Sequence, residues 1–135
     1  MTLRVGESVS YDVLAPTRTA LSGEPFVYVQ EFIPVREGTD PTLHGDEKGR
    51  LIATLYDCGT TCTKLVSAPF DIHNNKALQP QIEDGKLPRV DNKFLAAGHT
   101  LRLTLVMDND GNAASVQLFT GGTSNSRLAV TATPA

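Results

Sequence analysis

The segment HTLRLTLVM (99–107) places an apolar side chain at every second position from residue 101 to residue 107. A period of two residues is that of a β-strand with one buried face. Turn-forming residues punctuate the chain about every eight to twelve residues, and we find no long stretch with the 3.6-residue spacing of an amphipathic helix. Short strands separated by frequent turns predict an all-β fold, either a sandwich or a barrel.

The same reasoning predicts the other strands. We expect them over residues 24–35, 51–57, 62–70, 90–97, 113–119 and 127–133. Polar, turn-rich stretches over 36–50 and 74–90 predict two long loops, the second with at most a short helical turn. The segment 24–35 is apolar on both faces, which is typical of a central strand or of one that crosses between layers.

Length and charge narrow the class of protein. With 135 residues, we expect one domain over 1–135, large enough to bury a core. The net charge is −3 and the basic residues are scattered, so no nucleic acid is expected as a partner. No apolar run approaches the roughly 18 residues that span a bilayer, and residues 1–15 do not resemble a signal peptide. The chain is then either cytosolic or cut from a longer precursor.

Cys58 and Cys62 frame the turn between two predicted strands, 51–57 and 62–70. Paired across a hairpin, their α-carbons would lie within reach of a disulfide. Free thiols and a metal site are the alternatives, but a structural zinc site needs four ligands and no suitable spacing supplies them. A disulfide would indicate a secreted or cell-surface protein, and free thiols a cytoplasmic one.

The run Asp108-Asn109-Asp110-Gly111-Asn112 places acidic oxygens close together, as a calcium loop does. Its glycine is fourth and no glutamate follows, which departs from the EF-hand pattern. Asp-Gly between two alternating strands is also a strong hairpin signal. We therefore favour a turn over a calcium site.

Histidine is the side chain most suited to general base catalysis near neutral pH, and the chain has three: His44, His73 and His99. His99 follows a glycine at a strand start, where an imidazole more often satisfies nearby backbone groups than acts as a base. The other two lie in polar stretches and are expected to be solvated. No G-x-S-x-G turn is present, and GGTSNS (121–126) precedes no helix that could bind phosphate. We therefore assign no catalytic, metal or cofactor-binding residue and expect no cofactor.

The order of several segments goes further than their composition. GEPFVYV (23–29), LIATLYDCG (51–59), TKLVSAPFDI (63–72), FLAAGHTLRL (94–103) and SRLAVTATP (126–134) follow one another. In this order the chain resembles the C-terminal non-catalytic domain of the Xaa-Pro dipeptidyl-peptidase and cocaine-esterase type of serine hydrolase, over residues 10–134. The most specific matches are Phe94, Ala97, Gly98, His99, Leu101, Arg102 and Leu103, followed by Ser126, Arg127 and Leu128.

The resemblance implies a jelly-roll β-sandwich of the galactose-binding-like class. Such a domain packs on an α/β-hydrolase domain of the same protein and helps to shape its active-site cleft. The catalytic serine, aspartate and histidine of the family lie upstream, and none maps onto this sequence. The segment 107–111, the cysteine pair and the loop 36–50 depart from the family pattern, so we expect a divergent member or an excised domain.

A free-standing module that binds carbohydrate, or an adhesion domain, is the alternative. Lectin-like domains share the jelly-roll architecture. Sugar sites usually present exposed aromatic faces, and this chain has no tryptophan and three tyrosines, Tyr11, Tyr28 and Tyr56. Fold alone does not decide between these functions.

Overall fold

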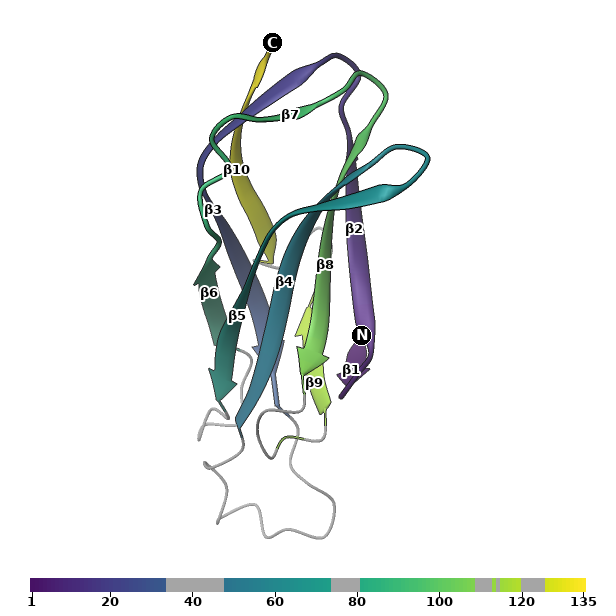
Figure 1. Ribbon diagram of the computed structural model, residues 1–135. Helices are drawn as coiled ribbons and strands as arrows, with labels where there is room; N and C mark the ends of the chain where they lie inside the picture. Colours follow the sequence, from purple (N-terminus) through teal and green to yellow (C-terminus); the bar gives the residue numbers. More distant parts are fainter. Residues whose placement is uncertain (34–47, 74–80, 109–112, 114, 120–125) are drawn as a thin grey trace, which may run out of the picture.

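The computed structural model describes residues 1–33, 48–73, 81–108, 113, 115–119 and 126–135, and these residues form strands and no helix (Figure 1). One sheet is built on the long strand β3 (Thr19–Phe32). On one side β3 pairs with β9 (Ser115–Phe119) and β10 (Arg127–Pro134), and β9 pairs in turn with β1 (Thr2–Arg4). On the other side β3 pairs with β6 (Gln81–Lys86) and β7 (Lys93–Leu95). The second sheet has the order β2 (Ser8–Leu14), β8 (Thr100–Asp108), β4 (Lys48–Cys58) and β5 (Cys62–His73). We call them the β3 sheet and the β8 sheet.

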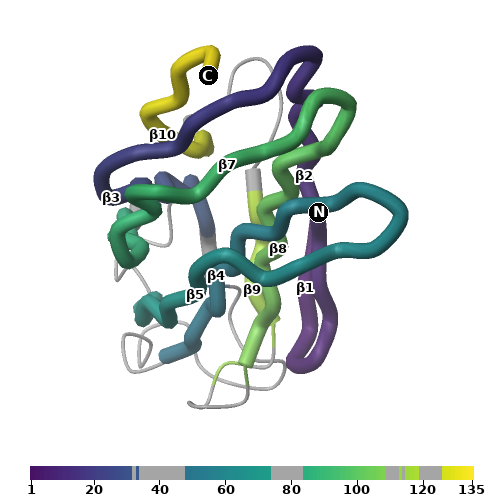
Figure 2. The backbone as a smooth tube through the Cα atoms, turned by 45° about the horizontal axis from the view of Figure 1, so that its top comes forward, coloured from purple at the N-terminus to yellow at the C-terminus, as the bar shows by residue number. Residues whose placement is uncertain are grey.

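Every strand pair is antiparallel, and the two sheets lie face to face with the core between them (Figures 1 and 2). The predicted all-β sandwich is therefore confirmed, while the jelly-roll class remains a prediction. Leu51, Ala53 and Leu55 of β4 are fully buried, and the alternating leucines of β8 face the same core. The two-residue period read from the sequence thus identifies the inner face of the β8 sheet.

The structure shows which face of the segment 24–35, apolar on both faces, points to the core. Val27 and Val29 are buried in the core, whereas Phe26 and Tyr28 lie on the outer face. The aromatic rings are only half-buried there, and β3 has neighbours on both of its edges. A central strand explains why both faces of this segment are apolar.

Several predicted boundaries were wrong. The segment 81–86 was expected to lie in a loop but forms β6, whose residues pair with β3 from Phe26 to Glu31. Strand β4 begins at Lys48, within the other predicted loop, and β7 occupies only Lys93–Leu95 of the strand expected over 90–97. The strands β1 and β2 and the first residues of β3 were not predicted. Strand β1 has only three residues and gives little local signal, whereas the alternation of polar and apolar residues in SVSYDV of β2 was a strand signal that the prediction missed.

Some predictions fall outside the described residues. These are the loop positions 36–47 and 74–80, the turn at 109–112, the glycine-rich stretch 121–125, and His44. The choice between a turn and a calcium site after Asp108 therefore remains a prediction.

Candidate functional site

Three connections gather at one end of the sandwich: the β4–β5 hairpin, the β7–β8 turn and the β2–β3 turn (Figures 1 and 2). The β7–β8 turn depends on Gly98, whose φ of 84° is a conformation that favours glycine. The amide of Gly98 donates to the carbonyl of Ala15, and the amide of Ala15 donates to the carbonyl of His99. These bonds attach the start of β8 to the end of β2.

The hairpin tip is closed by a disulfide between Cys58 and Cys62, whose α-carbons lie 4.0 Å apart. The two cysteines are cross-strand partners, and the amide of Gly59 donates to the carbonyl of Thr61 within the turn. A register shift between Leu55 and Tyr56 puts a β-bulge just before the tip. The predicted disulfide is confirmed, and no cysteine is free.

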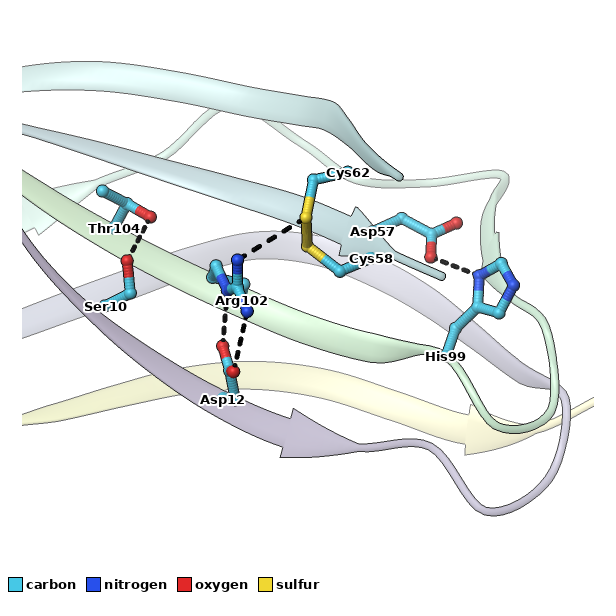
Figure 3. The surroundings of a disulfide bond; sticks show 8 residues. All are labelled: Ser10, Asp12, Asp57, Cys58, Cys62, His99, Arg102 and Thr104. Carbon is cyan, nitrogen blue, oxygen red and sulfur yellow. Dashed lines mark hydrogen bonds and ion pairs between the residues drawn. A yellow bond between two sulfur atoms is a disulfide. The ribbon is translucent and has the colours of Figure 1, made fainter. Parts of the chain in front are cut away.

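Arg102 joins three strands on the outer face of the β8 sheet (Figure 3). Its Nε donates to one carboxylate oxygen of Asp12 at 2.8 Å, and its Nη2 donates to the other at 3.1 Å. Its Nη1 points to Cys62, with 3.6 Å between Nη1 and Sγ. The hydrogen bond with Arg102 holds the pKa of Asp12 below its ordinary value of 3.8, and the same bond raises the pKa of Arg102.

His99 and Asp57 form the second contact at this end. The Nδ1 atom of His99 lies 2.7 Å from Oδ1 of Asp57 (Figure 3), and both side chains are partly exposed. We expected the imidazole to bind backbone groups; it pairs instead with a carboxylate on the neighbouring strand. A β-carbon on Gly59 would lie 2.7 Å from Nε2 of His99, so the glycine lets the ring pack against the hairpin.

An aspartate–histidine pair is two thirds of a serine-hydrolase triad, and the missing member is the nucleophile. Among the described residues, Nδ1 of His99 bonds to Asp57 and no hydroxyl or thiol contacts the ring in hydrogen-bond geometry. Nε2 instead faces the backbone at Gly59. The geometry suits a clamp that fixes the start of β8 to the end of β4.

An apolar cavity of about 350 Å³ opens between the two sheets at the edge bounded by β2 and β10. Its lining comes from five strands and includes Leu103 of β8 and Val27 of β3. Val13 lines the cavity yet is 65% exposed, which places it at the mouth. The sheets therefore do not close fully along this edge.

The other candidate residues lie apart from this end. His73 lines a polar depression of about 230 Å³ with Lys48, Arg50 and Asp71, where β4 begins and β5 ends. Asp108 stands opposite Arg50 in the backbone register of β4 and β8. In the described ranges, no three histidine, cysteine, aspartate or glutamate side chains gather as a metal site would require.

Sequence reasoning missed the acidic partners, Asp12 and Asp57, and also Asp91. The Asp91 carboxylate accepts from Arg89 and from the amide of Gly23, and the Arg89 bond, reinforced by that amide, lowers its pKa. A signal for Asp57 was available, because it stands in the LYDCG segment while His99 stands in AGHTLRL. Each segment was matched to the family separately, and the structure shows that their polar side chains are in contact.

In the described part of the chain, no helix has the length and apolar character to cross a membrane. No family model matches the chain, and no curated protein matches its sequence.

Solved structures do share the fold. An aminopeptidase from a marine sediment archaeon of the Thaumarchaeota superimposes with a TM-score of 0.70 and 7% identity over 97% of this chain and 28% of its own. An α-amino acid ester hydrolase gives 0.67 and 9% over 95% of this chain and 27% of its own. A CocE/NonD family hydrolase from Staphylococcus aureus gives 0.63 and 10% over 94% of this chain and 33% of its own. The chain thus has the fold of one part of these hydrolases and spans about three tenths of their length.

Proposed function

We propose that this chain is a non-catalytic accessory domain of an α/β-type serine hydrolase that cleaves an ester or an Xaa-Pro peptide bond. The observation that carries the proposal is the match to three hydrolases, each of which covers nearly all of this chain with about a third or less of its own length. A fold that is nearly complete in one part of a larger enzyme is the pattern of an added domain. The jelly-roll, galactose-binding-like class belongs to this proposal.

The clamp between His99 and Asp57 supports this reading. The AGHTLRL and LYDCG segments carried the resemblance to the hydrolase family, and their polar side chains meet at 2.7 Å. A structural contact of this kind explains why both segments occur in a domain that performs no chemistry. It also explains the histidine at the start of β8 without giving that side chain the role of a general base.

The partner in this proposal is the catalytic domain of the same protein. The open edge between β2 and β10 is the surface we assign to it, because Val13, an apolar residue at the mouth of the cavity, is 65% exposed. Exposed apolar side chains beside a cavity are typical of a surface that another protein segment covers. Packing there would let the domain form one wall of the active-site cleft.

The carbohydrate alternative finds less support. Tyr11 faces the core with a buried hydroxyl, and the guanidinium of Arg127 covers the ring of Tyr28 at 4.1 Å. Lys86 lies over the neighbouring Phe26 in the same way. Cations on these rings occupy the faces on which a sugar would stack.

We also propose that the protein is exported. The disulfide at the hairpin tip favours an extracellular location, since cytosolic thiols are kept reduced. Fractionation of source cells tests this, with the chain expected outside the cytosol.

The purified chain should have no hydrolase activity of its own. We would assay it with a p-nitrophenyl ester and with an Xaa-Pro anilide, using the His99→Ala variant as the matched control. The expected result is the same background rate for both proteins. Turnover by the wild-type chain that disappears in His99→Ala would contradict the assignment, because the chain would then carry its own catalytic group.

A further inference from the structure

The two sulfurs of the disulfide differ in their surroundings. Cys58 ends β4 and is only 7% exposed, whereas Cys62 begins β5 and is exposed at the hairpin tip. An incoming molecule therefore meets Cys62 before Cys58. Access to one sulfur is a condition for thiol–disulfide exchange there.

Cys62 also has a cation beside it. Asp12 accepts from Nε and Nη2 of Arg102, and this leaves Nη1 directed at the Cys62 sulfur at 3.6 Å (Figure 3). A fixed guanidinium stabilises negative charge on sulfur, both on a thiolate and on the three-sulfur transition state of exchange. Because Asp12 fixes the guanidinium, this position does not depend on a mobile side chain.

We propose that Cys62 is a site of thiol–disulfide exchange with small thiols of the glutathione type. The thiolate of the small thiol attacks Sγ of Cys62, a new disulfide forms at Cys62, and the bond to Cys58 breaks. Cys58 leaves as a thiolate and takes a proton from water. The thiolate of a second small thiol then attacks the small-thiol sulfur of this mixed disulfide, the bond to Cys62 breaks, and Cys62 leaves as a thiolate that takes a proton from water. The two small thiols leave as their oxidised dimer, so two small thiols are oxidised for each protein disulfide reduced.

The charges around Cys62 favour reaction there. Lys64 lies two residues after Cys62 in β5 and so on the same face of the strand, and Arg102 is the register partner of Asp12 on the adjacent strand β2. Two cations and one carboxylate thus lie on the strands around the exposed sulfur. Asp57 lies next to Cys58 in the chain, and its carboxylate is engaged with His99. This inference does not depend on the proposed accessory function.

Two single-cysteine variants test the proposal. Cys58→Ser leaves Cys62 as a free thiol, and Cys62→Ser leaves Cys58. With oxidised glutathione as the probe at pH 7, we expect Cys62 to form the mixed disulfide about tenfold faster than Cys58. In the Cys58→Ser background, Arg102→Leu should slow the reaction several-fold, while Arg4→Leu, which removes an exposed arginine in β1, should not.

A measurement on the wild-type chain covers the case in which a variant does not fold. The chain is treated with a limited amount of reduced glutathione, quenched with acid and digested, and the glutathione adduct is located by mass spectrometry. An adduct on Cys62 supports the proposal. An adduct mainly on Cys58, equal rates in the two single-cysteine variants, or a Cys62 rate unchanged by Arg102→Leu would overturn it.

Discussion

The imidazole of His99 and the carboxylate of Asp57 are paired at 2.7 Å, across the end of the β8 sheet. This contact joins residues that are far apart in the sequence, one at the end of β4 and one just before β8. Gly59 lies against the other side of the ring, so the hairpin tip, the carboxylate and the imidazole form one unit. The geometry makes this unit a structural clamp.

His99→Ala should therefore lower the free energy of unfolding. The loss is expected to be about 1 kcal/mol, the usual contribution of a partly exposed side-chain hydrogen bond. Asp57→Ala should cost a similar amount, and the double variant little more than either single one, because both remove the same contact. Urea unfolding of the four proteins checks this, and fully additive losses would show that the two side chains act independently.

Gly59→Ala tests the packing of the tip. An added β-carbon would lie 2.7 Å from Nε2 of His99, so the ring or the hairpin tip must shift. We expect a loss of about 1 to 3 kcal/mol in the free energy of unfolding, as overpacking usually gives. The same substitution in a His99→Ala background should cost much less. Equal costs in both backgrounds would mean that the ring does not pack on Gly59.

The ion pair between Asp12 and Arg102 should make stability depend on acid pH. The pKa of Asp12 is lower in the folded chain than its ordinary value of 3.8 because Arg102 donates to the carboxylate. Its contribution is thus present above the ordinary pKa and is lost as the pH falls through the folded pKa. Asp12→Asn should be less stable than wild type at pH 6, with the difference shrinking toward pH 3. Thermal unfolding at both values measures it, and a constant difference would contradict this origin.

Filling the cavity should stabilise the chain. Val130 lines the cavity from β10 and is half-buried, so Val130→Leu adds a methylene to space that is already open. A gain of up to about 0.8 kcal/mol in the free energy of unfolding is expected, the value for one buried methylene. Val116→Leu is the matched control, since Val116 is fully buried, does not line the cavity, and should lose about 1 to 3 kcal/mol on enlargement by the same single methylene. A loss in Val130→Leu as large as in the control would show that this edge is already closed.

Much of the β8 sheet could be predicted from the sequence. The alternating leucines of β8 and the Leu51, Ala53 and Leu55 series of β4 face the core as their two-residue period required. The disulfide also followed from local spacing, because Cys58 and Cys62 sit on either side of one turn. In both cases the information is local, within one strand or one hairpin.

What could not be predicted depends on contacts between distant segments. The polar segment β6 is a strand because its backbone pairs with β3, which its own side chains do not indicate. Strand β2 differs, because its sequence SVSYDV alternates polar and apolar residues; this local strand signal was missed, and β2 pairs with β8 over its full length. The partners of His99 and Arg102 were missed because Asp57 and Asp12 reach them only through the register of the sheet. The alternation of polar and apolar residues identifies the buried face of a strand, but it does not identify the strand or residue that pairs with it.

The mass of the native polypeptide tests the central proposal most directly. An antibody raised against this chain would be used on extracts and culture medium of the source cells, and the captured protein would be sized and assayed with the p-nitrophenyl ester and the Xaa-Pro anilide. We predict a polypeptide far larger than the 14.5 kDa of this chain, with hydrolase activity that a serine-directed inhibitor removes. A native polypeptide of 14.5 kDa without such activity would contradict the account, because no catalytic domain would accompany the sandwich.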